Sequence, residues 1–375
     1  MSSIFDALRS SGGQPTIFNA QGNVQAATLS KQMQNSILGE GNKQTLRIQA
    51  EYDTKVQKQN FEKDRWTQHN KLIEDAQDII NNNFTRLEGI YSTLDRMLNT
   101  INSAENSQND PDSSFRADGY SATFDSQLKS IYSSADESRV TTNLLNSDSR
   151  ELDYPISFNG VLSKVGGADI RPSYYITDSD GKRWQVETDT KLLRQYDSYP
   201  DAPTSPSKVA SFNRVDSLVL NGISGDDVTF TTSANTADAV TRTGTLNRSG
   251  LEILNSWLYG NFSTSEGRNR AREDIAAAKE ALFLEKARYA MVKTTLNYHS
   301  DVATAQIRDI RDETLKIQQE GQRKVADVQD ELVRKYKAAQ SALAQKFSLK
   351  ASLSALIPSG SSNNPVMQIL MDINA

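Results

Sequence analysis

The sequence predicts an α+β protein: a long antiparallel helical hairpin of coiled-coil-like terminal helices, with a small β-rich domain inserted between them. Three observations predict this fold class. Apolar residues recur every three or four positions over two long segments, one on each side of the middle of the chain. In the middle of the chain, apolar and polar residues instead alternate with period two, and turn residues bound these stretches. Only 37% of the 375 residues are apolar, which suits helices that bury one narrow stripe.

An amino-terminal helical segment is predicted over residues 26–147, with its main helix over 26–106. In its clearest part, steps of three and four residues place nine apolar side chains on one helix face. These are Ile73, Ala76, Ile80, Phe84, Leu87, Tyr91, Leu94, Leu98 and Ile101. Gly39 and Gly41 interrupt an earlier repeat, so we expect a bend near them.

A second, shorter helix is predicted over about 119–145. Its buried face is marked by Phe124, Leu128, Ile131 and Ala135. Because its apolar content is low, we expect it to lie against the first helix rather than to stand alone.

The inserted β-rich domain is predicted over residues 148–262 and contains two hairpins. In the first, Ile176 precedes the turn residues Asp180-Gly181, and Trp184 follows them. The second hairpin has Leu218 and Leu220 before its turn and Val228 and Phe230 after it.

A carboxy-terminal helix is predicted over residues 263–356, pairing with residues 26–106. Its first half has an apolar residue every seven positions, which is typical of a coiled coil. These residues are Ile275, Leu282, Tyr289, Leu296, Ala303, Ile310 and Ile317. From Ile317 to Phe347 the steps follow an eleven-residue period, which favours a straight or slightly right-handed coil.

Both ends of the chain lie outside the predicted helices. Residues 1–25 are rich in Ser, Gly, Gln and Asn, so we expect a flexible segment that orders on assembly. Residues 357–375 are predicted to be a flexible link and an apolar tail that docks on a neighbour, or else a frayed tail. The start lacks the features of a cleaved secretory signal, and no stretch reaches the ~20 apolar residues of a membrane span.

Composition excludes several classes of chemistry. The chain has no cysteine, which rules out thiol catalysis, disulfides and cysteine-ligated metals. Its formal net charge of −5 gives no basic face for nucleic acid. Phosphate-binding loops, dinucleotide fingerprints and nucleophile elbows are missing from the sequence. We therefore expect a protein that is not an enzyme, has no cofactor, and has no catalytic, cofactor-binding or metal-binding residues.

Two patterns are candidate binding sites. In the predicted hairpin, residues whose numbers sum to roughly 370 lie side by side, so His69 and His299 are expected to be neighbours. Two imidazoles without a third ligand make an incomplete metal site, and we interpret both as helix-surface residues. Asp178, Asp180 and Gly181 match part of a calcium loop, but its first position lacks an oxygen ligand and its flanks alternate like strands. A hairpin turn is the preferred interpretation.

The apolar stripes are also candidate self-association surfaces, because long paired helices leave apolar side chains for other copies to cover. The residues assigned to self-association are Leu29, Met33, Ile37, Ile310, Ile317, Val325, Val328, Leu332, Tyr336, Leu343, Phe347, Ile369 and Leu370.

This order of helix, short helix, β domain and long helix resembles bacterial flagellin and the hook–filament junction proteins. The absence of cysteine and the Ser/Gln/Asn-rich start are also similar to flagellar axial proteins, and the string SFNGVLS (157–163) resembles a flagellin turn. The usual flagellin opening is absent, and the terminal helices carry more charge than filament-core helices. The resemblance implies an extracellular polymer, exported by a type III route, with terminal helices inside and the β domain outward.

The function expected from these observations is that of a structural subunit of a self-assembling extracellular filament. Its partners would be copies of itself, with other axial or appendage proteins and an export chaperone as further partners. Two alternatives stay open. One is a type III secretion tip or translocon-like protein, and the other is a cytosolic or phage-like structural scaffold.

Overall fold

The structure of the protein, a computed structural model, describes most of the chain. The described residues are 20–109, 117–137, 142–187, 192–196, 209–214, 217–234 and 236–355. The chain forms two compact units. The terminal unit comprises residues 1–64 and 307–375, and the central unit comprises residues 65–306. The predicted end segments, 1–25 and 357–375, lie outside the described residues except for 20–25, which are helical.

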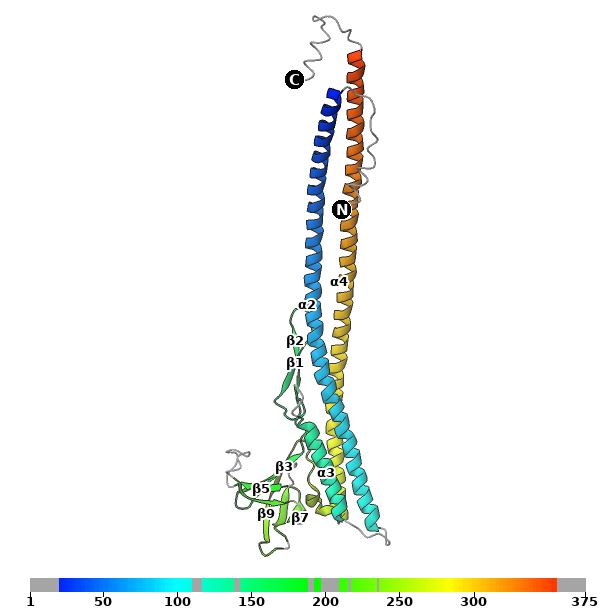
Figure 1. Ribbon diagram of the computed structural model, residues 1–375. Helices are drawn as coiled ribbons and strands as arrows, with labels where there is room; N and C mark the ends of the chain where they lie inside the picture. Colours follow the sequence, from blue (N-terminus) through cyan, green and yellow to red (C-terminus); the bar gives the residue numbers. More distant parts are fainter. Residues whose placement is uncertain are drawn as a thin grey trace. The chain divides into compact units, whose positions relative to one another are not determined.

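Two long helices contribute to both units. α2 spans Ala20–Asn109 and α4 spans Ser265–Ala355, while α3, Ala117–Ala135, belongs to the central unit (Figure 1). α2 continues as a helix through Gly39 and Gly41, where the sequence predicts a bend. α4 begins after Thr264, whose side-chain oxygen accepts a hydrogen bond from the Gly267 amide at 3.1 Å, as a helix N-cap does.

Nine strands lie in the described part of the inserted region, and all belong to the central unit. β1 and β2 form a two-stranded antiparallel sheet, and the other strands form a seven-stranded sheet in the order β6-β5-β4-β3-β9-β8-β7. Their bounds are Glu151–Pro155 (β1), Leu162–Gly166 (β2), Ser173–Asp178 (β3), Arg183–Glu187 (β4), Leu192–Tyr196 (β5), Val209–Arg214 (β6), Val219–Ser224 (β7), Asp227–Thr232 (β8) and Val240–Ser249 (β9). The predicted α+β fold class with an inserted β-rich region is therefore confirmed.

Both predicted hairpins are present. In the β3–β4 hairpin Ile176 pairs with Trp184, and in the β7–β8 hairpin Leu220 pairs with Phe230. The pairing that joins them, β3 with β9, links segments about 70 residues apart and has no local sequence signal.

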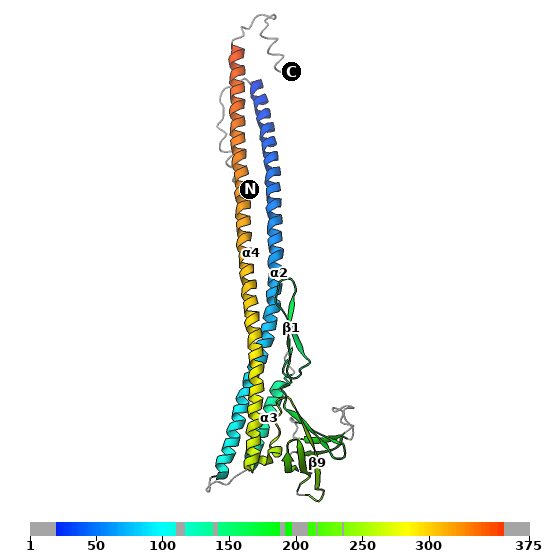
Figure 2. The same cartoon turned by 180° about the vertical axis from the view of Figure 1, so that it is seen from behind.

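The central unit has a continuous apolar core. Figures 1 and 2 show α3 beside α2 and α4, on the side where the seven-stranded sheet lies. Fully buried side chains come from every one of these elements. They include Ile80, Leu87, Leu94 and Ile101 of α2, Phe124 and Ile131 of α3, Leu282 and Leu296 of α4, and Ile176, Trp184 and Phe230 of the sheet. The 3-10 turn η3, Ser256–Phe262, adds Trp257, whose ring nitrogen donates to the Tyr174 hydroxyl at 2.9 Å.

α3 ends earlier than the sequence predicts. The predicted helix runs to about residue 145, but α3 stops at Ala135. The guanidinium of Arg86 in α2 donates to the carbonyls of Ser134 and Ala135, and the Asn143 amide also donates to the Ala135 carbonyl at 2.8 Å. These donors satisfy the last carbonyls of α3, which would otherwise be unpaired, so the helix closes there.

Candidate assembly surfaces

The helix pairing has the predicted antiparallel register inside each unit. In the central unit the Ser300 hydroxyl donates to the Asn70 side-chain oxygen at 3.1 Å, and the Gln77 amide donates to Asn297 at 2.9 Å. In the terminal unit the Tyr52 hydroxyl donates to Glu320 at 2.9 Å. The two numbers of each pair sum to between 370 and 374, which confirms the register expected from the sequence.

Close helix contact in the terminal unit depends on two glycines. A β-carbon at Gly41 would lie 2.1 Å from Cδ1 of Leu332, and one at Gly321 would lie 2.9 Å from Cγ of Tyr52. Both distances are shorter than van der Waals contact, so each glycine accommodates a large side chain of the facing helix. Gly41 therefore marks a packing contact and not a helix break.

Most residues predicted to mediate self-association lie on the facing sides of α2 and α4 in the terminal unit. We call this set the terminal seam. Its members are half-buried: Met33, Ile37, Ile310, Ile317, Val325, Val328, Leu332, Tyr336, Leu343 and Phe347. Leu29 is exposed, and Ile369 and Leu370 lie outside the described residues. The structure thus brings ten of the predicted residues onto one helix pair, while their role in self-association stays a prediction.

Burial of the same periodic pattern differs sharply between the two units. In the central unit Ile275, Leu282, Tyr289 and Leu296 are fully buried, because α3 and the loop at 142–150 cover the helix pair as well. In the terminal unit the described residues comprise α2 and α4 alone, and two helices leave both sides of their contact line accessible. The terminal seam is therefore apolar but incompletely covered.

A groove of 490 Å³ runs beside the terminal seam. Its floor contains Val56, Gly321 and Val325, and four glutamines form its rim. The glutamines that line it are Gln49, Gln318, Gln322 and Gln329. Asp53 is the charged residue among those that line the groove, and the apolar floor with its amide rim suits contact with another helix.

An aromatic contact attaches the β1–β2 hairpin to α2 in the central unit. Phe158, in the SFNG turn between the strands, stacks on Trp66 with ring centroids 4.2 Å apart. The Arg65 guanidinium lies 4.4 Å from the Phe158 ring centroid, and His69 meets that ring edge-on at 6.1 Å. A two-stranded hairpin is marginally stable alone, so this contact is what fixes its tip.

The two histidines are neighbours, as the register predicts. Partial burial lowers the pKa of His69 below its ordinary 6.5, and the nearby His299 lowers it further. Both factors favour the neutral imidazole of His69. Trp66 contacts His69 edge-on, at 5.7 Å between centroids.

Buried phenols belong to the packing of the central unit. Burial raises the pKa of Tyr289 to about 12, and burial raises the pKa of Tyr174 further still. Burial and then the Asp274 carboxylate raise the pKa of Tyr259, whose hydroxyl donates to Asp274 at 2.6 Å. Each hydroxyl has a hydrogen-bond partner and stays protonated at neutral pH.

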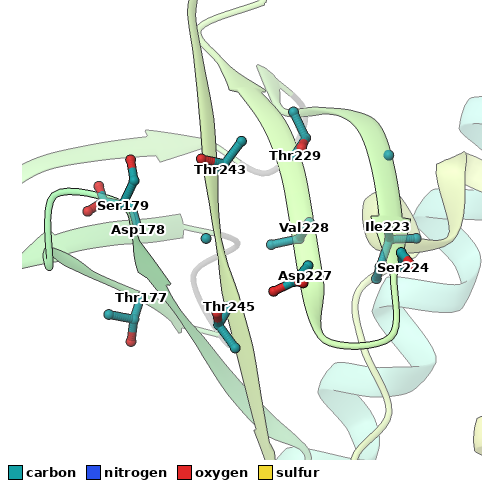
Figure 3. A pocket seen from close by; sticks show the side chains of 12 residues that line it. Thr177, Asp178, Ser179, Ile223, Ser224, Asp227, Val228, Thr229, Thr243 and Thr245 are labelled. Atoms are coloured by element: carbon teal, nitrogen blue, oxygen red, sulfur yellow. The ribbon is translucent and has the colours of Figure 1, made fainter.

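An open hollow of about 650 Å³ lies where β3, β9, β8 and β7 come together (Figure 3). Hydroxyl side chains dominate it, including Thr177, Thr229, Thr243 and Thr245. The carboxylate of Asp178 accepts the amides of Asp180 and Lys182 and the ring nitrogen of Trp184, at 2.8 to 3.1 Å. Those bonds hold a hairpin turn, as the sequence predicts, and occupy the oxygens that a calcium loop would offer.

A second apolar surface was missed by the sequence analysis. On the side of α4 away from α2, Phe283, Leu284, Met291 and Tyr298 are exposed by 66, 62, 73 and 64%. Leu284, Met291 and Tyr298 are seven residues apart, which is the signal that could have found them. The prediction from the sequence used the heptad repeat that faces α2 and did not consider this second heptad repeat in the same stretch of α4.

Within the described residues no three His, Asp or Glu side chains are grouped to hold a metal ion. None of the described helices combines the length and apolarity needed to cross a membrane.

Comparison with known proteins gives weak structural similarity alone. No protein-family model matches the sequence, and no curated protein matches it. A crystal structure of Xanthomonas campestris FlgL, in space group C2, is similar to this chain with a TM-score of 0.25 and 11% sequence identity. The match covers 78% of this chain and 98% of that one.

Proposed function

We propose that this chain is a structural subunit of a self-assembling extracellular filament, flagellin-like, with its terminal helices in the polymer core and its β region facing outward. Its partners are copies of itself and other axial or appendage proteins. Its role is mechanical and not catalytic, and export uses a type III route with a chaperone.

The observation that carries this proposal is the incomplete burial of the terminal seam. Ten large, mostly apolar side chains repeat over the terminal parts of α2 and α4, yet every one stays half-buried. At about 25 cal/mol per Å² of apolar surface, covering such a row with further helices is strongly favourable. Copies of the same chain offer helices of matching length and period, as in a helical polymer core.

Polymerisation of the purified protein tests the proposal. We expect the weight-average mass to rise with concentration in sedimentation velocity, and fibres in negative-stain electron microscopy. Deleting residues 1–30 or 357–375 should abolish the fibres while circular dichroism keeps its helical signal. A particle of constant mass at all concentrations, or truncated chains that polymerise normally, would contradict it.

A matched pair near the end of α4 separates the seam from general surface apolarity. Phe347 is half-buried in the terminal seam, while Leu349 is 64% exposed and lies off it. Phe347→Ala should raise the critical concentration for polymerisation at least tenfold, whereas Leu349→Ala should leave it within twofold. Equal effects of the two substitutions would argue against a core built on the seam.

The proposed location is tested separately from assembly. The protein should be recovered in material sheared from the cell surface, and lipid flotation should leave the purified chain in the aqueous fraction. Recovery in lysate alone would favour the cytosolic or phage-like scaffold, and flotation with vesicles would favour the translocon-like alternative.

A further inference from the structure

The exposed side of α4 in the central unit is apolar over more than six helical turns. Between residues 276 and 298, twelve exposed residues form what we call the outer α4 face. They are Ala276, Ala277, Glu280, Ala281, Phe283, Leu284, Ala287, Ala290, Met291, Thr294, Asn297 and Tyr298. Glu280 alone among these twelve is charged. Lys293, the other exposed charge in this stretch, turns toward α2, with its ammonium 5.8 Å from the Phe84 ring.

The same helix is differently composed further along. Between residues 308 and 337, most exposed side chains of α4 are charged or are glutamine, as expected of a solvated helix surface. The apolar composition is therefore local to residues 276–298. A contiguous exposed apolar patch of this kind on a soluble protein marks an interaction site.

From these observations we infer that two copies of the chain pair antiparallel through the outer α4 face. The inference goes beyond the proposed function: a two-fold contact sets the two copies in opposite directions, so the pair is a form of the chain outside the filament. Its occupant is a second copy because the face is complementary to itself in the antiparallel orientation, in both size and polarity.

Heptad spacing supplies the register. Leu284, Met291 and Tyr298 repeat at one heptad position, and Glu280, Ala287 and Thr294 repeat at a second position, four residues before each of them. In an antiparallel pair these two positions face each other. When Ala287 lies on Met291 of the partner, Leu284 lies on Thr294 and Glu280 lies on Tyr298.

This register suits every layer of the contact. Ala287 makes room for the long Met291 side chain, and Leu284 packs on the methyl group of Thr294. The carboxylate of Glu280, the charged member of the face, can accept a hydrogen bond from the Tyr298 hydroxyl. Two-fold symmetry makes each of these layers occur twice.

The area is sufficient for a specific pair. The four large side chains, about two-thirds exposed, offer on the order of 500 Å², and the small residues raise the face to about 700 Å² per copy. Two such faces bury about 1,400 Å², within the range of specific protein interfaces. A two-fold contact closes on itself, so growth of a polymer must use another surface, which the terminal seam provides.

Register-specific crosslinking tests the pairing, because the natural chain has no cysteine. Full-length Ala287→Cys and Met291→Cys proteins, mixed and oxidised, should give the mixed disulfide dimer at least tenfold faster than Ala338→Cys mixed with Met291→Cys. Ala338 is also an exposed helical alanine of α4, but it lies in the terminal unit. Equal rates for the two mixtures would overturn the inference.

A substitution pair gives a second readout. Met291→Asp should raise the dimer dissociation constant at least tenfold in sedimentation equilibrium, and Leu315→Asp, on an exposed part of α4 in the terminal unit, should change it less than twofold. Circular dichroism checks that both keep their helical content. If the wild-type chain is a monomer and the Met291→Cys variant resists alkylation, the chain covers this face itself, which overturns the inference.

The outcomes separate the two proposals. Fibres that form equally well from Met291→Asp and wild type, without the mixed disulfide, would remove this pairing and leave the filament role standing. A mixed disulfide dimer together with a wild-type chain that never forms fibres would support the pairing and remove the filament role.

Discussion

Glycines in the long helices serve different purposes at different positions. Gly321 lies against Tyr52, and an added β-carbon there would be 2.9 Å from Cγ, at the base of the ring. Gly39 has no atom within 4 Å of the same added carbon. A helical glycine lowers stability by about 1 kcal/mol relative to alanine, so the balance depends on the room available.

Alanine at these two positions should change stability in opposite directions. Gly39→Ala should raise the free energy of unfolding by about 1 kcal/mol through helix propensity. Gly321→Ala should lower it by roughly 1–2 kcal/mol, because overpacking against Tyr52 exceeds the propensity gain. Urea unfolding followed by circular dichroism measures both. A stabilising Gly321→Ala would mean that the two helices are not held at this contact.

The burial of individual residues was predictable where it depended on one helix face. The buried face of α3 and the fully buried Ile275, Leu282, Tyr289 and Leu296 follow from spacing alone. The role of Gly41 could not be predicted, because it depends on Leu332 of the facing helix. A glycine that admits a distant side chain and one that breaks a helix look the same in one sequence.

At the scale of elements, the β1–β2 hairpin stands apart from the seven-stranded sheet. Its turn is attached to α2 through the stack of Phe158 on Trp66. The strands also bury Leu152, Tyr154 and Val165 in the core, so the stack adds to the order of the hairpin at its turn.

Removal of the Phe158 ring should loosen the hairpin selectively. Phe158→Ala should increase hydrogen exchange of amides in β1 and β2 at least tenfold, while α3 exchanges as before. Val161→Ala is the control, because Val161 lies in the same turn but is about half exposed. Mass spectrometry of exchanged peptides reads both variants. Unchanged exchange in Phe158→Ala would show that strand pairing and core packing hold the hairpin without the stack.

Element types were more predictable than element ends or strand order. Period-two alternation with Asp180-Gly181 predicts the β3–β4 hairpin, and the structure has it. The end of α3 depends on Arg86, 49 residues before Ala135, and no local signal marks it. Likewise, the β3–β9 pairing depends on the burial of a whole sheet face and not on a turn.

At the scale of the whole molecule, the two units differ in how far their cores are covered. Side chains of the terminal seam are half-buried, whereas the corresponding residues of the central unit are fully buried. Incomplete burial gives less hydrophobic stabilisation per residue. Opening of the terminal unit should therefore require less free energy than opening of the central unit.

Hydrogen exchange should resolve the two units within one helix. In the unassembled chain, α4 amides at 310–345 should exchange at least 100-fold faster than those at 275–303. The same contrast is expected in α2 between residues 30–60 and 73–101. In the polymer, exchange of the amides at 310–345 and 30–60 should slow selectively, because neighbouring copies then cover the seam. Uniform protection along both helices would contradict the difference in stability.

The two parts of the terminal unit are far apart in the sequence, which affects how the unit forms during synthesis. The hydrogen bond from Tyr52 to Glu320 joins residues 268 positions apart. While a ribosome is still making the β strands, the first part of α2 therefore has no partner helix, and the central unit can fold before it. A chain truncated at residue 306 would contain the folded central unit and an unpaired first part of α2. Such a chain would be a substrate for proteases.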